Sequence, residues 1–132
     1  MTELVLKAEE VAKRAYAPYS NYFVGAAVMT SSGQIFSGCN VENASYSCVS
    51  CAEAGAVSAM IRAGERQIAA VLTICDGEEL GTCCGACRQR VREFAASLDI
   101  PVYAADRTGV RATFTLDGLL PHSFGPSHLH QP

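Results

Sequence analysis

Apolar and polar residues recur along the first third of the chain with periods that predict one helix and two strands. Residues 3–16 have the apolar period of an amphipathic helix, which has to end before Pro18. Residues 23–30 and 34–41 are strand-like runs on either side of a short turn that ends at Gly33. This pattern predicts a helix followed by a β-hairpin.

The rest of the chain alternates between helical and strand-like patterns. We predict helices over 52–63 and 85–97, strands over 67–75, 99–105 and 110–116, and one helical turn over 117–120. An antiparallel hairpin followed by strands with helical crossovers is typical of an α/β fold. The sequence therefore predicts a three-layer α/β/α sandwich with a mixed sheet of about five strands, formed by one domain over residues 1–132.

Composition narrows the class of protein. The chain has 132 residues, of which 49% are hydrophobic and 17% charged, as in ordinary globular proteins. A net charge of -3 without a dense basic block argues against a nucleic-acid partner. No apolar run approaches the roughly 20 residues of a membrane span. The N-terminus is acidic, unlike a signal peptide, so we expect a cytoplasmic protein with no membrane partner.

Seven cysteines are many for a chain of this kind. The odd number, without a signal peptide, does not fit a secreted disulfide scaffold, so metal binding or redox chemistry is the better interpretation. Cys39, Cys48 and Cys75 are interpreted as isolated cysteines, and we expect them to be small buried hydrophobic residues.

Two short motifs place thiols at predicted helix starts. Cys51-Ala52-Glu53 opens one helix, and Cys84 and Cys87, separated by two residues, open another. Helix N-termini stabilise thiolates, and this spacing is common for two ligands of one zinc ion. Three ligands leave one tetrahedral position for water, as in catalytic zinc sites. Glu53 is then placed to act as general acid and base.

Other interpretations of the same cysteines stay open. A Cys-x-x-Cys pair alone also occurs in thioredoxin-like redox proteins. Cys83 or Cys48 could close a four-ligand structural zinc site. The joint occurrence of three cysteines and a glutamate that is not a ligand favours a catalytic zinc, as in zinc deaminases.

The sequence as a whole resembles the cytidine deaminase family in its small homotetrameric form. The similarity runs along nearly the whole chain, in several motifs that occur in the family's order. They are Tyr16-Ala17-Pro18-Tyr19-Ser20, Phe23 to Ala27, Gly38 to Tyr46, Cys51-Ala52-Glu53, Cys84 to Gln89, Leu120-Pro121 and Phe124-Gly125-Pro126.

The resemblance implies a role for each matching position. One zinc ion per subunit would be held by Cys51, Cys84 and Cys87, with Glu53 as the proton shuttle. The remaining positions would bind the nucleoside: Asn40 and Glu42 the ribose 3′-hydroxyl, Phe23 its apolar surface, the backbone of Ala52 and Cys84 the base, and Ala44, Tyr46 and Phe124 the site of a neighbouring subunit. A homotetramer with shared sites is implied.

Two positions depart from the family pattern. Ala54 stands where the family usually has an arginine that offsets thiolate charge, which leaves Arg88 as the expected compensator through hydrogen bonds to a ligand sulfur. Cys83 stands where the family usually has proline. Loss of this proline frees a backbone N–H, and we hypothesise that the loosened loop admits N4-substituted cytidines.

The leading functional hypothesis is hydrolytic deamination of cytidine and 2′-deoxycytidine for pyrimidine salvage. A deaminase of an antibiotic nucleoside such as blasticidin S is the nearest rival, and the acidic charge disfavours a polynucleotide editor. An inactive, zinc-stabilised module is the alternative from another class, although it would not need Glu53. His122, His128 and His130 are expected to be solvated tail residues.

Overall fold

Helices and strands alternate along the chain in the computed structural model, which describes residues 1–129. The longer elements are α1 (Thr2–Ala12), β1 (Val24–Thr30), β2 (Ile35–Cys39), α2 (Ala52–Arg62), β3 (Ile68–Cys75), α3 (Gly85–Phe94), β4 (Pro101–Asp106), β5 (Gly109–Thr115) and α4 (Leu116–Leu119). Two single-turn 3-10 helices are η1 (Tyr46–Cys48) and η2 (Pro126–Leu129).

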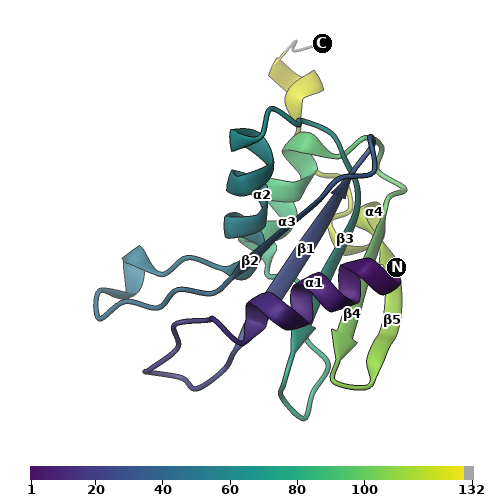
Figure 1. The fold of residues 1–132 in the computed structure, drawn as a ribbon. Helices are drawn as coiled ribbons and strands as arrows, with labels where there is room; N and C mark the ends of the chain where they lie inside the picture. Colours follow the sequence, from purple (N-terminus) through teal and green to yellow (C-terminus); the bar gives the residue numbers. More distant parts are fainter. Residues whose placement is uncertain (130–132) are drawn as a thin grey trace.

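The five strands form one mixed sheet in the order β2-β1-β3-β4-β5. β1 is antiparallel to both β2 and β3, β3 is parallel to β4, and β4 is antiparallel to β5. Helix α1 lies across one face of the sheet, while α2 and α3 lie side by side on the other (Figure 1). This arrangement confirms the predicted α/β/α sandwich and its mixed five-stranded sheet.

Each face of the sheet has its own apolar core. Leu4 and Ala8 of α1 pack against Ala27, Leu72 and other side chains of the front face. The second core lies between the sheet and helices α2, α3 and α4, and its largest fully buried members include Val28, Met60, Val71, Val91 and Val102. Because consecutive strand residues point to opposite faces, odd and even positions of β1 belong to different cores.

Two glycines allow the helices to approach the strands closely. A Cβ atom on Gly25 would lie 2.1 Å from the carbonyl oxygen of Ala8, and one on Gly38 would lie 2.4 Å from the backbone nitrogen of Ala56. The small residues predicted in the first strand therefore serve helix packing at Gly25. Gly38 does the same for α2, the helix that carries Cys51 and Glu53 at its start.

Three elements were predicted to extend too far at their C-terminal ends. α1 ends at Ala12 rather than at residue 16, because Tyr16 donates its N–H to the carbonyl of Asn40 (3.0 Å) and accepts one from Glu42 (2.8 Å). β2 ends at Cys39 rather than at residue 41. α3 ends at Phe94 rather than at residue 97, because the N–H of Ala96 bonds the carbonyl of Ile68 (2.9 Å) instead of continuing the helix.

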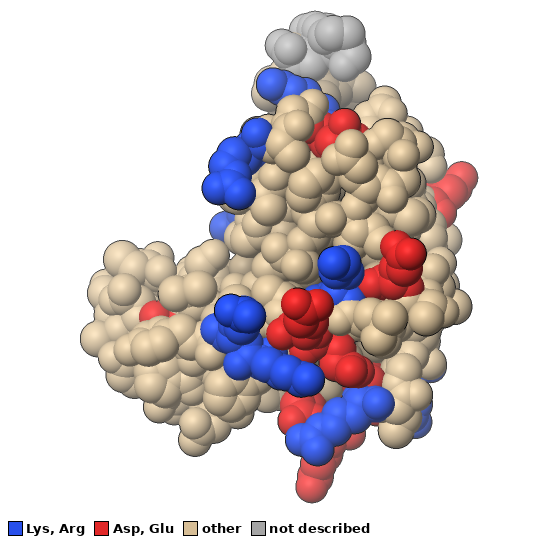
Figure 2. All heavy atoms as spheres, viewed as in Figure 1, with Lys and Arg blue, Asp and Glu red and all other residues tan. Residues whose placement is uncertain are grey.

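Charged side chains of both signs mingle on the surface around α1 (Figure 2). The arm that contains η1, which projects from the left of Figure 1, has hardly any charge on this face. Within residues 1–129, no helix is both long enough and apolar enough to cross a lipid bilayer.

Candidate metal and catalytic site

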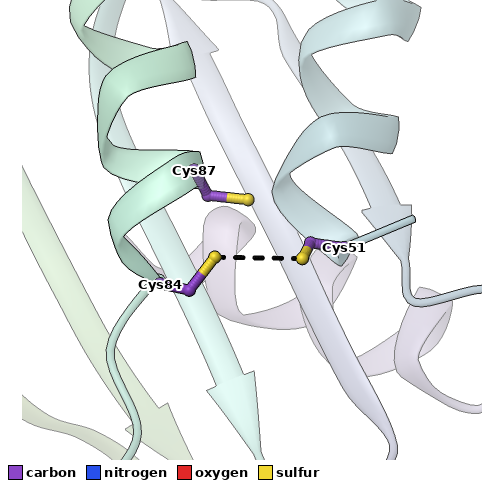
Figure 3. Close-up of side chains that lie close together, drawn as sticks. All are labelled: Cys51, Cys84 and Cys87. Carbon is purple, nitrogen blue, oxygen red and sulfur yellow. Dashed lines mark hydrogen bonds between the residues drawn. The ribbon is translucent and has the colours of Figure 1, made fainter. Parts of the chain in front are cut away.

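Three thiols converge where α2 and α3 begin. Cys51 is the N-cap of α2 and Cys84 the N-cap of α3, each with extended backbone before its helix. Cys87 lies in the first turn of α3 and points back toward the other two sulfurs (Figure 3). Because α2 and α3 are neighbours on the sheet, residues 33 positions apart meet at one point.

The sulfur positions fit a zinc ion. All three Sγ atoms lie within 4.8 Å of one another, and those of Cys51 and Cys84 are 3.9 Å apart. A tetrahedral site with Zn–S bonds of about 2.3 Å has sulfurs about 3.8 Å apart. Exposure falls from Cys84 through the half-buried Cys51 to the buried Cys87, so the group opens to solvent on one side.

The three thiols differ in acidity. Burial, reinforced by the neighbouring Cys84, raises the pKa of Cys51, and burial together with the charge of Glu53 raises the pKa of Cys87. Burial also tends to raise the pKa of Cys84. Hydrogen bonds from the Cys87 backbone and from both other thiols outweigh burial and bring the pKa of Cys84 below its ordinary value. Binding of a metal ion at these thiols would release protons, because the thiolate is the form that ligates.

The other predicted ligands, Cys83 and Cys48, lie outside this thiol group. Among residues 1–129, Cys51, Cys84 and Cys87 are the one group of metal-ligating side chains this close together. Cys83 is buried in the core beneath α3, and burial raises its pKa to about 11. Cys48 is exposed on η1, so its expected burial was wrong, whereas Cys75 is buried and Cys39 half-buried. None of the cysteines forms a disulfide within the described chain.

Glu53 is a buried carboxylate beside the thiols. It is the second residue of α2 and is only 3% exposed. Its Oε2 accepts a hydrogen bond of 2.8 Å from the hydroxyl of Thr73 on β3. Its charge acts on the pKa values of Cys51, Cys84 and Cys87, which places the carboxylate within electrostatic reach of every sulfur in the group.

The structure corrects the expected contact of Arg88 with a ligand sulfur. Arg88 donates to three oxygens: the carbonyls of Cys83 (2.9 Å) and Leu119 (2.7 Å) and the hydroxyl of Thr82 (2.9 Å). These bonds fasten the segment before α3. The arginine that reaches a ligand is Arg90, whose Nη1 lies 3.5 Å from the sulfur of Cys87. Helical spacing could have identified it, since residues three apart share a helix face.

Asn40 and Glu42 hold the loop that precedes β1. The amide of Asn40 accepts from the N–H of Val24 and donates to the carbonyl of Tyr22, both at 2.9 Å. Glu42 accepts from the backbone N–H groups of Tyr19 (3.0 Å) and Ser20 (3.2 Å) and from the Ser20 hydroxyl. The Ser20 hydroxyl is the main cause that lowers the pKa of Glu42. Glu42 also lines a cavity of about 290 Å³ beside the η1 arm.

Phe23 does not lie where it was predicted. It lines a cavity of about 570 Å³ together with Ala12 and Lys13 of α1, on the front side of the sheet. Its neighbour Tyr22 lies instead against Gly77 and Gly81, in the segment that leads to the thiols of α3. The period-two alternation of β1 could have distinguished the two residues, because even positions such as Val28 face α2 and α3.

The hydroxyl of Tyr22 also contacts the thiol of Cys75 at the end of β3. This hydrogen bond is the main cause that raises the pKa of Tyr22 to about 12, and burial adds to it. Burial is the main cause that raises the pKa of Cys75, and the charge of Glu53 adds to it. Tyr22 is thus linked to Glu53 through the thiol of Cys75, although the sequence analysis did not identify Tyr22 as a site residue.

The residues expected to act on a neighbouring subunit are exposed. Tyr46, on η1, is 81% exposed, and Phe124 is 55% exposed. Ala44 lies on the same arm as Tyr46, whereas Ala52 is buried at the start of α2. The structure does not bring Ala44, Tyr46 or Phe124 to the thiols of their own chain, since none lines the group or hydrogen-bonds with it.

The C-terminal segment is ordered by α3 more than expected. Gln89 donates to the carbonyl of Phe124 (2.8 Å), and Arg92 donates to the hydroxyl of Ser123 (2.8 Å). The ring of His128 stacks on Phe124 with 4.8 Å between centroids, although His128 is exposed as predicted. His122 is exposed as predicted, and His130 lies outside the described residues.

Comparison with known proteins agrees with this site. Residues 1–101 match the family model of the cytidine and deoxycytidylate deaminase zinc-binding region. A cytidine deaminase of Sporosarcina psychrophila is 36% identical over 127 residues, which cover 96% of this chain and 93% of that protein. The crystal structure of cytidine deaminase from Burkholderia pseudomallei is 38% identical with a TM-score of 0.84, covering 93% of this chain and 98% of that one. The structure from Mycobacterium tuberculosis is 33% identical with a TM-score of 0.79, covering 94% and 96%.

Proposed function

The chain belongs to the zinc-dependent cytidine deaminase family, and we propose that it hydrolyses cytidine and 2′-deoxycytidine to uridine and 2′-deoxyuridine with release of ammonia. The observation that carries this proposal is the meeting of three free thiols with one buried carboxylate at two adjacent helix starts. A structural zinc site would not need that carboxylate.

The thiols of Cys51, Cys84 and Cys87 are the residues that would hold zinc. When bound, the ion lowers the pKa of a coordinated water molecule and so supplies hydroxide at neutral pH. The chain's own contribution is to place these sulfurs at helix N-termini, where backbone dipoles favour the thiolate forms.

Glu53 is the group that moves protons in this proposal. The oxygen of water adds to C4 of the base, and the C4–N4 bond breaks as ammonia leaves. The attacking water loses both of its protons as its oxygen becomes the C4 carbonyl. Glu53 accepts the first and delivers it to N3 of the base, then accepts the second and delivers it to the departing N4, so that the carboxylate consumes no net proton. Its burial beside the thiols and its exclusion from the ligand group fit this role.

Nucleoside binding is assigned to the loop that Asn40 and Glu42 hold. The Glu42 carboxylate would accept a hydrogen bond from the ribose 3′-hydroxyl beside Asn40, and the hydrogen bond from Ser20 that lowers the pKa of Glu42 also fixes its position. The backbone of Ala52 and Cys84 orients the base. Tyr22 replaces Phe23 as the aromatic contact, because it lies on the thiol side of the sheet.

A homotetramer with shared sites is the proposed assembly. Tyr46 and Phe124 are large and exposed, and the arm that carries Ala44 and Tyr46 has little charge on the face shown in Figure 2. These features suit insertion into a neighbouring copy. Residues 1–132 would act as one catalytic domain in a cytoplasmic enzyme of pyrimidine salvage, with neither nucleic acid nor membrane as partner.

Acceptance of N4-substituted cytidines, or of an antibiotic nucleoside of the blasticidin S type, is a second candidate that depends on Cys83. Unlike proline, Cys83 has a backbone N–H and no ring that fixes its φ angle. Its carbonyl accepts a hydrogen bond from Arg88, and its side chain is buried. Kinetics on cytidine and N4-methylcytidine with wild type and Cys83→Pro would decide. Equal ratios of kcat/KM in the two proteins would exclude a role for Cys83 in substrate breadth.

The direct test of the proposed function is the loss of cytidine absorbance with purified protein, coupled to measured ammonia. We expect one ammonia per cytidine consumed, loss of activity after dialysis against a chelator, and recovery after zinc is added. Stable cytidine in the presence of protein with bound zinc would instead favour the inactive, zinc-stabilised module.

A further inference from the structure

A single hydroxyl interrupts the apolar strand at the centre of the sheet. β3 is buried along almost all of its length, and Thr73 is its only residue with a side-chain oxygen. Thr73 is 1% exposed, and its hydroxyl donates to Oε2 of Glu53 at 2.8 Å. Thr73 is absent from every motif identified in the sequence, so its contact with Glu53 is new information from the structure.

Burying a hydroxyl in an apolar strand costs free energy unless the hydroxyl is hydrogen-bonded. An unpaired hydroxyl in an apolar setting costs about 1–3 kcal/mol, and valine would fill the same volume without that cost. Within residues 1–129, no buried side-chain oxygen or nitrogen lacks a hydrogen-bond partner. The partner that pairs the Thr73 hydroxyl is Glu53, so the presence of threonine is tied to the carboxylate.

The neighbours of Thr73 in the sheet leave room for the glutamate. Thr73 pairs with Ala26 on β1 and with Ala104 on β4, and both alanines are at most 1% exposed. The residues that flank Thr73 on the two neighbouring strands are thus both alanines, whose side chains are single methyl groups. A row of larger side chains would push the carboxylate away from the sheet, whereas this row gives it a floor with one fixed donor.

We propose that Thr73 is a positioning residue that holds the Glu53 carboxylate in its productive orientation. Thr73 has one hydroxyl proton and uses it on Oε2, so Oε1 is the oxygen left to exchange a proton with water and the leaving group. A buried carboxylate on a flexible side chain would otherwise turn about its terminal torsion, which has a broad minimum. This inference rests on the proposed deaminase function.

The test compares three variants that separate the hydroxyl from the shape of the side chain. Thr73→Val keeps the shape and removes the donor, and Thr73→Ser keeps the donor and removes a methyl group. Thr30→Val is the matched control, because Thr30 is also 1% exposed and hydrogen-bonded, but on β1 where it pairs with Ile68 at the far end of β3. All three are measured with zinc content and melting temperature beside them.

The expected result is a loss in kcat of about 10- to 100-fold for Thr73→Val, as for other small misplacements of catalytic groups. KM should stay within about twofold, because Thr73 does not touch the nucleoside. Thr73→Ser should recover most of kcat, and Thr30→Val should change stability without changing kcat. Zinc content should stay at one ion per chain in every variant.

A binding measurement tests the same idea without turnover. A nucleoside analogue with a tetrahedral, hydroxyl-bearing C4 should bind Thr73→Val about 10-fold more weakly than it binds wild type, whereas uridine should bind both equally. In a Glu53→Ala background, Thr73→Val should cause no further loss of analogue affinity, because its partner is already absent. An equal further loss in that background would overturn the inference.

The outcomes distinguish this inference from the proposed function. If wild type releases no ammonia from cytidine, the proposed function fails. If wild type is active and Thr73→Val keeps kcat within about twofold, or loses it together with zinc or fold, the positioning role of Thr73 fails while the deaminase function stands. Failure of Thr73→Ser to recover kcat would also overturn it.

Discussion

At the scale of single residues, the sulfur of Cys87 accepts a hydrogen bond from the guanidinium of Arg90. Three thiolates and Glu53 carry four negative charges against two on a zinc ion, and Arg90 is the arginine that hydrogen-bonds a ligand sulfur within the described chain. Ala54 contributes nothing to this balance, since its side chain is a methyl group. We therefore propose that Arg90 of α3, rather than Arg88, compensates the thiolate charge.

Removing this guanidinium should weaken metal retention. We expect Arg90→Met to lose zinc to a competing chelator about 10-fold more readily than wild type, the usual size of an outer contact to a ligand. Arg62→Met is the control, because Arg62 lies in the last turn of α2, at the opposite end of that helix from Cys51. Equal zinc retention by both variants would show that Arg90 has no part in the site.

The contact between Tyr22 and Cys75 predicts a pH effect at the alkaline end. The pKa of Tyr22 is raised from 10.0 to about 12, so the folded state favours the neutral phenol. Its contribution to stability is fully present below pH 10 and is lost as the pH rises toward 12, because the unfolded chain ionises first. Phenolate absorbance should show one tyrosine titrating late in wild type, and that late step should move down in Cys75→Ala. A late step that is unchanged in Cys75→Ala would contradict the assignment.

At the scale of elements, Gly38 sets the height of α2 above the sheet. A Cβ at this position would lie 2.4 Å from the nitrogen of Ala56 and 2.5 Å from the carbonyl of Ala52. Gly38→Ala should therefore lift the start of α2, costing about 1–3 kcal/mol of stability as in other overpacked cores. Cys51 and Glu53 move with that helix, so zinc content should fall as well.

Gly55→Ala provides the matched control on the facing side of the same contact. Its Cβ would meet Gly38 at 3.4 Å, an ordinary packing distance, and alanine favours the helix. Thermal unfolding and zinc content should stay near the wild-type values in Gly55→Ala. A Gly38→Ala protein with wild-type melting and full zinc would mean that α2 tolerates the displacement.

The order and kind of every α-helix and β-strand could be predicted from the pattern of apolar residues, because each helix buries one stripe and each strand one or both faces. The two 3-10 helices were not predicted. Their ends could not, since Tyr16 leaves α1 to pair with Asn40, and Ala96 leaves α3 to bond Ile68. Such endings depend on contacts distant in the sequence. The cysteine motifs identified the thiol group for a related reason, since both motifs open helices that lie side by side.

The errors and omissions in the candidate site have the same origin. Phe23 and Tyr22 are adjacent in the chain but face opposite layers, so their roles follow from strand alternation rather than from a motif. Arg88 is drawn to the backbone of Thr82, Cys83 and Leu119, which are brought together only by folding. The sequence analysis did not identify Thr73, because one threonine in an apolar run forms no recognisable motif.

At the scale of the whole molecule, the η1 arm and Phe124 predict that one subunit completes the site of another. If sites are shared, a Phe124→Ala subunit keeps its own Glu53, and a Glu53→Gln subunit still offers a sound Phe124. Each variant alone should be nearly inactive. Mixed during refolding, the two should form hybrid assemblies in which some sites have both groups, so that activity returns.

The mixing experiment has a clear opposite result. Activity that never exceeds the sum of the two separate variants, in assemblies shown by mass measurement to contain both chains, would place Phe124 and Glu53 in independent sites. Mixing Glu53→Gln with Cys84→Ser is the control, because both changes strike the same cluster of one chain, and no hybrid can then combine a sound Glu53 with sound thiols unless wild-type subunits are present.

The central claim is that three thiols hold zinc while Glu53 performs the proton transfers. The most direct measurement determines zinc content and ammonia release from cytidine on the same samples of wild type and Glu53→Gln. The account predicts one zinc ion per chain in both proteins and a fall in ammonia release of at least about 100-fold in the variant. Full ammonia release by Glu53→Gln, or loss of its zinc, would contradict the claim.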